Sequence, residues 1–278
     1  MNFNDVSIVI ITYNSDLIIS KFIKKIPNKI KVIIIDNSNN DKIKTNLKNK
    51  KNIKIFLKKN NGVSRALNFA VKKISTKYFL QISPDIDFNF NDLQYFLNYA
   101  KKIKNRFSAI GPRFINVNQK SHKQISPKRK IGEIDSIHGS CMFVNKKNYE
   151  KIGGFDNKFF LYFEETDYCL RGKKLGLKSY QINKIKVKSI GRSVNEKNIN
   201  ELKYILIWHF IWSKYYYTKK NFSLIFTLSV FTPIMIRIIF RILISLMIFK
   251  KDEFRKYRFR LNGLVCSILG KKSYLRPR

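Results

Sequence analysis

Two groups of acidic side chains are the residues in this sequence best suited to chemistry. Asp85 and Asp87 follow a short apolar run, and their carboxylates are the hard oxygen ligands that Mg²⁺ and Mn²⁺ prefer. A cation of this kind offsets the negative charge that develops on a departing diphosphate. Most Asp-x-Asp tripeptides are solvated turns, so the pair indicates metal-assisted chemistry only where its surroundings support it.

The second acidic group, Glu164, Glu165 and Asp167, directly follows the apolar run Phe159–Phe163. Acids in the first turn of a helix are stabilised by the helix dipole, which is a purely structural explanation. Apolar surroundings would also desolvate a carboxylate and raise its pKa toward that of a useful general base. The residues alone leave both explanations open.

Further polar residues follow other apolar runs and could bind a nucleotide. Asp36 could accept hydrogen bonds from a base or ribose, or could form an Asx-turn with the two residues after it. Asn61 and Gly62 precede a predicted helix whose free N–H groups, with Arg65, could bind phosphate. An ordinary turn followed by a surface arginine is the alternative.

The elements that position these residues alternate along the first half of the chain. Short runs rich in Ile and Val are typical of buried parallel strands, and they occupy Val6–Ile11, Lys31–Ile35, Ile53–Leu57 and Tyr78–Ile82. The apolar spacing from Val63 to Ile74 predicts a helix. The pattern predicts an α/β fold with a mostly parallel central sheet flanked by helices. Such sheets bind ligands beyond the carboxyl ends of their strands, where the polar groups fall.

Later segments give a less regular pattern. We expect a loop or hairpin over 113–134, a strand over Cys141–Val144, and helices over Lys146–Ile152 and Glu164–Leu175 that end at glycines. Residues 222–249 carry only two charges, Arg237 and Arg241. Their uncharged part, 222–236, is 15 residues, shorter than the ~20 that span a bilayer. We therefore predict an amphipathic helix in the headgroup region. A tilted spanning helix and a buried soluble helix are alternatives.

Composition adds a strong charge imbalance. The chain has 56 Lys plus Arg and 18 Asp plus Glu, a formal charge of +38, which attracts polyanions such as anionic lipid, nucleotide phosphates or nucleic acid. Lys, Asn and Ile are enriched together throughout, as an AT-rich genome would produce, so the charge has a second explanation. Three widely spaced cysteines, and a strand-like run that begins at Val6, predict a cytosolic protein without a disulfide framework or signal peptide.

Taken in order, these segments resemble glycosyltransferase family 2, most closely its rhamnosyltransferase-like branch. The resemblance covers roughly residues 6–221 and is most specific from Gly139 to Gly176. The matching stretches are SIVIITYNS (7–15), VIIIDNSN (32–39), NNGVSRALNFAV (60–71), QISPDIDF (81–88), HGSCMFVNKKNYEKIGGFDNKFFLYFEETDYCLRGKKLG (138–176) and, more weakly, WSKYYYTKKN (212–221).

The resemblance implies a GT-A fold, a nucleotide-diphosphate sugar donor and an inverting displacement assisted by Mg²⁺ or Mn²⁺. It assigns Asp85 to the metal and diphosphate, with Asp87 second. Glu165 would be the general base, paired with Glu164, and Asp167 would orient the site. The residues implied around the donor are Thr12, Tyr13, Asn14, Asp36, Asn61, Gly62, Arg65 and Asp85.

Two positions depart from the family pattern. Glu165 stands where Asp is usual, so its carboxylate reaches about one methylene farther. Ser189 stands where the family often has a histidine that helps to bind the metal. These departures leave the implied fold unaffected. Altered metal dependence and reduced activity stay open as alternatives.

We expect a catalytic domain over 1–221 and a basic, apolar, membrane-associating helical tail over 222–278. The expected function is transfer of a sugar, for example rhamnose, to a hydroxyl of a lipid-linked or cell-surface polysaccharide in a bacterium. The protein would lie on the cytoplasmic face of the cell membrane, with an anionic membrane surface and not nucleic acid as its partner.

Two other classes remain open on the sequence alone. A basic protein that binds nucleic acid or membrane surfaces would explain the charge, but not the polar groups at strand ends. A catalytically inactive scaffold in a polysaccharide assembly complex would keep the fold without the reaction. Specific binding of a nucleotide diphosphate with Mn²⁺ distinguishes the glycosyltransferase fold from a general polyanion-binding protein. Turnover of a nucleotide sugar then distinguishes an active enzyme from an inactive scaffold.

Overall fold

The computed structural model describes residues 3–38, 40–47, 50–116, 123–191 and 199–276. The chain forms two compact units: unit 1 comprises Met1–Asp156 and Glu165–Asn195, and unit 2 comprises Asn157–Glu164 and Glu196–Arg278. The functional division after residue 221 stays a prediction, because it concerns what each part does. The units are described one at a time.

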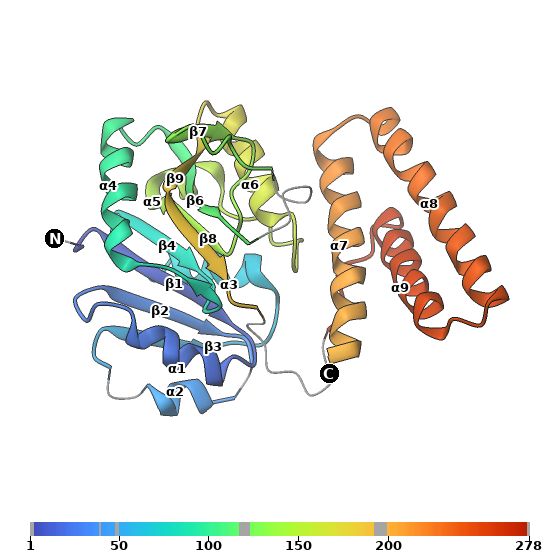
Figure 1. The fold of residues 1–278 in the computed structure, drawn as a ribbon, viewed down its shortest axis with the longest axis horizontal. Helices are drawn as coiled ribbons and strands as arrows, with labels where there is room; N and C mark the ends of the chain where they lie inside the picture. Colours follow the sequence, from blue (N-terminus) through green and yellow to red (C-terminus); the bar gives the residue numbers. More distant parts are fainter. Residues whose placement is uncertain (1–2, 39, 48–49, 117–122, 192–198, 277–278) are drawn as a thin grey trace. The chain divides into compact units, whose positions relative to one another are not determined.

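Unit 1 is built on one mixed β-sheet with the strand order β3-β2-β1-β4-β8-β6-β9-β5 and with β7 paired to β9 (Figure 1). The strands are β1 (Val6–Thr12), β2 (Lys31–Asp36), β3 (Ile53–Leu57), β4 (Tyr78–Ile82), β5 (Ile86–Asp87), β6 (Phe107–Phe114), β7 (Ile131–Ile134), β8 (Cys141–Asn145) and β9 (Lys178–Ser189). The four strands predicted first, β1 to β4, are mutually parallel and adjacent, whereas β8 runs antiparallel between β4 and β6.

Helices cover both faces of this sheet. One core cluster joins the strands to α1 (Asp16–Lys24), α2 (Lys42–Asn46) and α4 (Leu93–Lys102), which follows the short η1 (Phe90–Asp92). A second cluster joins the opposite face to α3 (Val63–Val71), α5 (Lys146–Ile152) and α6 (Glu164–Lys174). The α/β arrangement predicted from the alternating pattern is therefore confirmed.

Local capping chemistry fixes the helix that follows β8. The side chain of Asn145 accepts a hydrogen bond from the backbone N–H of Asn148, which caps the start of α5. The same helix ends at Gly153, whose φ of 87° is the left-handed conformation that favours glycine. The predicted helix over Lys146–Ile152 is confirmed.

The sequence pattern was least informative over the second half of unit 1. The segment 113–134, predicted as a loop or hairpin, contains the end of β6 and all of β7, while residues 117–122 lie outside the described part. Strand β9 was not predicted, although buried and more exposed positions alternate along most of it. Three of its buried residues, Ser179, Gln181 and Asn183, are polar, so the alternation does not appear as a hydrophobic pattern in the sequence. All three cysteines are free and buried, consistent with the absence of a disulfide framework.

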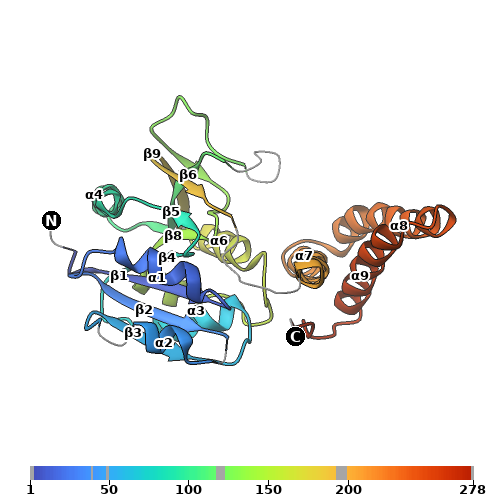
Figure 2. The same cartoon turned by 60° about the horizontal axis from the view of Figure 1, so that its bottom comes forward.

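Unit 2 contains three long helices, α7 (Ile199–Asn221), α8 (Leu224–Met247) and α9 (Lys251–Ile268). In Figure 2, where α7 is seen nearly end-on, α8 and α9 lie together on one side of it. Their shared core is formed by Ile211, Tyr215, Phe231, Ile238 and Leu264. Within the described ranges, α8 alone is long and apolar enough to cross a membrane by length and composition.

Helices α7 and α9 approach closely at Gly263. A Cβ added there would lie 2.7 Å from the backbone oxygen of Trp208 and 2.9 Å from Ile211 Cγ2. A Gly→Ala change in an open helix stabilises it by about 1 kcal/mol. Here we predict the opposite sign, because an added methyl group must push α9 away from α7.

Gly263→Ala should therefore lower the free energy of unfolding by roughly 1–3 kcal/mol, measured by urea denaturation. Arg258→Ala, an exposed position on the same helix, should change it by less than about 0.5 kcal/mol. A stabilised Gly263→Ala protein would show that the α7–α9 contact is looser than the structure gives.

Candidate active site

The carboxyl ends of the parallel strands meet at one edge of the sheet, and polar residues gather there. β2 ends at Asp36 and β1 at Thr12, and these two residues are paired in the strand register. β4, the next strand along, leads into Ser83, Pro84 and Asp85. Because β8 is antiparallel to β4, it begins at this same edge, directly after His138-Gly139-Ser140.

A hydrogen-bonded cluster surrounds Asp36. Its Oδ1 accepts hydrogen bonds from Thr12 Oγ1 at 3.0 Å and from Ser38 Oγ at 2.6 Å. The backbone N–H of Asn14, which has a φ of 47°, donates to Ser38 Oγ at 2.6 Å. The structure thus brings Thr12, Asn14 and Asp36 together through Ser38. The N–H of Ser38 also donates to Asp36 Oδ1 at 3.2 Å, so the Asx-turn that was the structural alternative for Asp36 is present. Tyr13 lies between Thr12 and Asn14 and is partly exposed.

The start of α3 lies beyond the end of β3. Gly62 precedes the helix with a φ of 91°, a conformation that side chains other than glycine rarely adopt. As a glycine, Gly62 has no side chain that could cap the helix. Asn61 and Arg65 are exposed beside it. The start of a helix beside an exposed arginine is suited to an anion.

Asp85 is partly buried and is held by Ser189. The Ser189 hydroxyl donates to Asp85 Oδ2 at 3.0 Å, and the N–H of Ile190 donates to the Asp85 backbone oxygen at 2.8 Å. Burial raises the pKa of Asp85, and the hydrogen bond from Ser189 offsets part of that rise. Ser189, which stands where the family often has a histidine, therefore contacts Asp85, the residue predicted to bind the metal.

Asp87 has different surroundings from Asp85. It ends the two-residue strand β5, is largely exposed, and forms an ion pair with Lys25, which follows α1, at 2.8 Å. Its carboxylate is therefore already shared with an ammonium group, whereas the contact to Asp85 is a neutral hydroxyl.

Glu165 is enclosed at the start of α6. Burial raises its pKa, and backbone N–H groups, including those of Gly139 and Thr166, offset part of the rise. A Cβ added to Gly139 would lie 3.6 Å from Glu165 Cδ, so the loop before β8 packs directly on this carboxylate. A desolvated glutamate of raised pKa is suited to act as a general base near neutral pH.

The two other acids of this segment are more deeply buried. Asp167 is fully buried, and its Oδ2 accepts a hydrogen bond from Arg171 Nε at 2.8 Å. Arg171 also donates to the backbone oxygens of Ile152 and Gly154. Asp167 therefore helps to fix α6 to the turn after α5, and its predicted role in orienting the site stays a prediction. Glu164 is also buried.

The turn before α6 is held within unit 2 by α7. Tyr162 and Phe163 have φ values of 68° and 67°, which is strained for non-glycine residues. Ser213 donates to the backbone oxygen of Leu161 at 2.8 Å, and the Phe163 ring lies 5.5 Å from that of Phe210. These contacts keep the strained turn in place within unit 2.

One hydrogen bond connects the two acidic motifs. The N–H of Ser83, two residues before Asp85, donates to the backbone oxygen of Ser140 at 2.8 Å. Ser140 adjoins Gly139, which packs against Glu165. Segments 80 residues apart in sequence are therefore neighbours at one edge of the sheet. Sequence reasoning did not identify the role of Gly139, although it lies at the start of the most specific family stretch.

Buried oxygen atoms without partners also gather at this edge. Each belongs to the end of a strand or the first turn of a helix there. Those lacking a hydrogen-bond partner within the described residues include Asp36 Oδ2, Ser64 Oγ, Gln81 Oε1 and Glu165 Oε2. A buried acceptor without a donor is costly, so each of these oxygens can accept a hydrogen bond from a water molecule or from a ligand.

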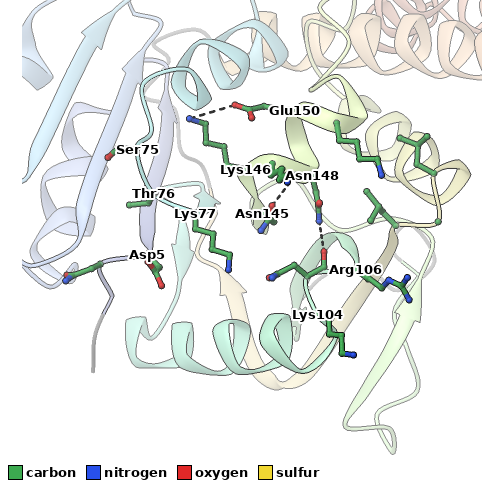
Figure 3. Close-up of a pocket in the computed structure, with 17 residues that line it drawn as sticks. Asp5, Ser75, Thr76, Lys77, Lys104, Arg106, Asn145, Lys146, Asn148 and Glu150 are labelled. Carbon is green, nitrogen blue, oxygen red and sulfur yellow. Dashed lines mark hydrogen bonds and ion pairs between the residues drawn. The ribbon is translucent and has the colours of Figure 1, made fainter.

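A groove of about 1270 Å³ lies at the opposite edge of the sheet (Figure 3). Asp5 and Lys77, which precede β1 and β4, line it together with the turn before β6 and with α5. Its inner polar groups are already used: Asn148 Nδ2 donates to the backbone oxygens of Asn105 and Phe107. We place the site at the carboxyl edge, where acceptors remain unsatisfied, and not in this groove.

Comparison with known families and proteins gives consistent matches. The family model described as glycosyl transferase family 2 matches residues 7–170. The low-salt glycan biosynthesis hexosyltransferase Agl10 of Haloferax volcanii is 25% identical over 193 residues, 62% of each chain. The dTDP-rhamnosyl transferase RfbF of Shigella flexneri is 27% identical over 220 residues, 69% of this chain and 72% of that protein. The chain thus spans about 62% of the length of Agl10.

Solved structures show the same fold. The mannosyltransferase PcManGT from Pyrobaculum calidifontis, in complex with GDP-Man and Mn²⁺, matches 96% of this chain and 88% of its own, with a TM-score of 0.64 at 11% identity. Residues 1–349 of S. aureus TarS, in complex with UDP-GlcNAc, match 98% of this chain and 93% of that one, with a TM-score of 0.55 at 13% identity. The expected GT-A fold is confirmed.

The enclosed Glu165 carboxylate should lower stability when it is ionised. Its raised pKa means that the folded chain binds this proton more tightly than the unfolded chain does. Stability is therefore lost as the pH rises from the ordinary value of 4.5 through the raised pKa, and the full penalty is present above it.

Glu165→Gln should stabilise the protein at neutral and alkaline pH by roughly 1–3 kcal/mol, the typical cost of a buried unpaired polar atom. The difference in melting temperature should shrink toward zero as the pH falls to 4.5. Glu150→Gln, at an exposed position, is the control and should show neither effect. Destabilisation by Glu165→Gln at pH 8 would contradict the described environment.

Proposed function

The chain belongs to glycosyl transferase family 2, and we propose that it transfers a sugar from a nucleotide-diphosphate donor to a hydroxyl group with inversion at the anomeric carbon. The observation that carries this proposal is the hydrogen bond from Ser83 to Ser140, which holds the loop that packs on Glu165 beside the strand end that carries Asp85. A diphosphate-binding acid and a general base are the two groups that a single displacement requires.

The Asp36 cluster supports a nucleotide donor. Asp36 Oδ2 is a buried acceptor suited to an N–H of a base or a hydroxyl of a ribose, and Thr12 and Ser38 hold the other oxygen in place. The names of matched proteins mention dTDP-rhamnose chemistry, GDP-Man and UDP-GlcNAc. We propose a nucleotide-diphosphate sugar for this chain, with rhamnose as one candidate sugar.

The residues present fit a divalent cation that is shared with the donor. Among the described residues, no group of three or more metal-ligating side chains occurs. Mg²⁺ commonly binds through one or two carboxylates and substrate phosphates, and Asp85 offers a carboxylate that accepts a hydrogen bond from the neutral hydroxyl of Ser189. Asp85 would hold the cation, with Ser189 orienting its carboxylate. The bound cation would neutralise charge on the departing diphosphate.

The chain's own residues then account for the proton and for the geometry. Glu165 takes the proton of the acceptor hydroxyl as that oxygen forms a bond to the anomeric carbon. The bond from that carbon to the diphosphate oxygen breaks, and its electron pair leaves with the nucleoside diphosphate. The N–H groups of Gly139 and Thr166 hold the Glu165 carboxylate in place. Displacement from the side opposite the leaving group inverts the carbon.

We further propose that the acceptor is a lipid-linked or cell-surface glycan and that the protein works on the cytoplasmic face of the membrane. The charge of +38 and the apolar exposed surface of α8 support this location. A plain polyanion-binding protein would have no use for unpaired buried acceptors at the carboxyl edge.

Asp85→Asn should lower kcat for transfer by at least ~100-fold, the scale of removing one group that stabilises transition-state charge. Asp87→Asn should lower it far less, because that carboxylate is exposed and paired with Lys25. Initial rates with a panel of nucleotide sugars measure both, and melting curves check that each variant is folded. Equal losses would contradict the ranking of the two acids.

The pH profile tests the general base separately. Glu165 must be ionised to accept a proton, and burial raises its pKa, so kcat/KM should fall as the pH drops through a value above 4.5. Glu165→Asp, which restores the residue usual in the family, should move this acid limb while retaining activity. A limb at or below 4.5, or one unaffected by Glu165→Asp, would exclude Glu165 as the base.

A further inference from the structure

Helix α8 presents two apolar faces with different surroundings. One face is buried within unit 2 and includes Phe231 and Ile238, which share a core with Ile211 and Tyr215 of α7. The opposite face, here called the outward face, consists of Ile225, Ile236, Phe240, Leu243 and Met247, which are 53–82% exposed. Phe249, at the turn after α8, is 87% exposed.

Such a continuous apolar face normally marks an interaction site in a soluble protein. The charges around it indicate what it contacts. Arg237 and Arg241 are exposed on α8 about a third of a turn to one side of the outward face. Lysine pairs lie close to both ends of the helix, at Lys219-Lys220 and Lys250-Lys251. An apolar strip bordered by cations is complementary to acyl chains beneath anionic headgroups.

We infer that α8 docks lengthwise on an anionic bilayer, with the outward face among the acyl chains and the two arginines in the headgroup layer. This deepens the membrane location proposed above by assigning the contacting face and its orientation. It rests on that proposal only for its biological setting, since the surface itself is defined by exposed side chains.

The position of the arginines favours the lengthwise orientation over spanning. In a helix from Leu224 to Met247, Arg237 lies roughly 2 Å from the midpoint along the axis. A spanning helix would therefore hold a guanidinium at the centre of the bilayer, its least favourable depth. In the lengthwise orientation both arginines reach the headgroups.

Helix α9 gives a second, independent reason. It packs against α8 through the shared core and begins with charged residues. Its second and third turns carry Arg255, Lys256, Arg258 and Arg260, which lie roughly 6–14 Å along the axis from its start. If α8 crossed the membrane, this packed neighbour would bring those charges into the hydrocarbon. A helix that lies along the surface leaves α9 on the aqueous side.

Depth measurements at two positions distinguish the orientations. Ile225 and Leu243 are five helical turns apart, so they lie on one line of the outward face, about 27 Å apart along the axis. Variants with one cysteine added at either position would carry a fluorescent label on full-length protein bound to phosphatidylcholine–phosphatidylglycerol vesicles. The wild type, whose three cysteines are buried, provides the labelling blank.

Depth-dependent quenchers should place both labels at the same shallow depth. Labels on opposite sides of the bilayer would overturn the lengthwise orientation, and so would labels that remain in water on bound protein.

Vesicle flotation tests the contacting face and its charges. The double variant Ile236→Glu with Leu243→Glu should reduce the bound fraction at least tenfold. Leu175→Glu, at a leucine of similar exposure in unit 1, should leave it unchanged. Arg237→Gln with Arg241→Gln should weaken binding to anionic vesicles more than binding to neutral ones. Equal binding by all variants would reject the assigned face.

Two further readouts separate this inference from other outcomes. If the wild type sediments as a dimer without vesicles and Ile236→Glu makes it monomeric, the face is an interface between copies and the inference fails. Hydrolysis of nucleotide-diphosphate sugars without vesicles should be equal in the wild type and the face variants. If hydrolysis is absent from every chain while docking is intact, the proposed function fails and the docking surface stands.

Discussion

The antiparallel placement of β8 beside β4 is the constraint on which the active site depends. Parallel strands alone would bring Thr12, Asp36 and Asp85 to the carboxyl edge. They would not bring Glu165, the proposed general base, to that edge. Because β8 runs the other way, its preceding loop returns to the same edge, where Ser140 accepts the hydrogen bond from Ser83. Gly139 then brings the start of α6, and with it Glu165, into the same region. A substitution that disturbs this loop would therefore separate the groups that act together.

Two carboxylates of the candidate site are held in place at one oxygen and lack a hydrogen-bond partner among the described residues at the other. Asp36 and Glu165 each have one oxygen held by hydrogen bonds and one buried oxygen without a partner within the described ranges. An unsatisfied acceptor lowers the stability of the ligand-free protein, and a ligand that supplies donors recovers that free energy. Three carboxylates at one edge also repel a diphosphate, which explains why the donor would need a cation at Asp85. Asp167 differs, since Arg171 compensates its charge and fixes the helix that carries Glu165.

Much of this architecture could be predicted from the sequence. Strands β1, β2 and β4 are short apolar runs that are almost entirely buried, and the edge strand β3 is a similar run that is partly exposed, so composition alone indicated all four. The polar residues that follow them indicated the carboxyl edge as the candidate site. Strands β6 and β9 could not be predicted in the same way, because their register depends on pairing with each other across about 70 residues. The bond from Ser83 to Ser140 joins two backbone groups and leaves no side-chain signal. The resemblance to the family identified the two segments that this bond joins, 81–88 and 138–176, but it did not show that they are neighbours in the fold.

The central claim is that Asp85 and Glu165 border one ligand site, and paramagnetic broadening by Mn²⁺ tests it most directly. The protein would be labelled with ¹³C at glutamate carboxyl carbons and saturated with a nucleoside diphosphate and either Mn²⁺ or diamagnetic Mg²⁺. The Glu165 signal, identified by its loss in Glu165→Gln, should broaden strongly with Mn²⁺, whereas the signals of Glu133 and Glu150 should remain sharp. Asp85→Asn should abolish the broadening. A sharp Glu165 signal in the Mn²⁺-saturated wild type would show that the metal and the proposed base occupy separate sites.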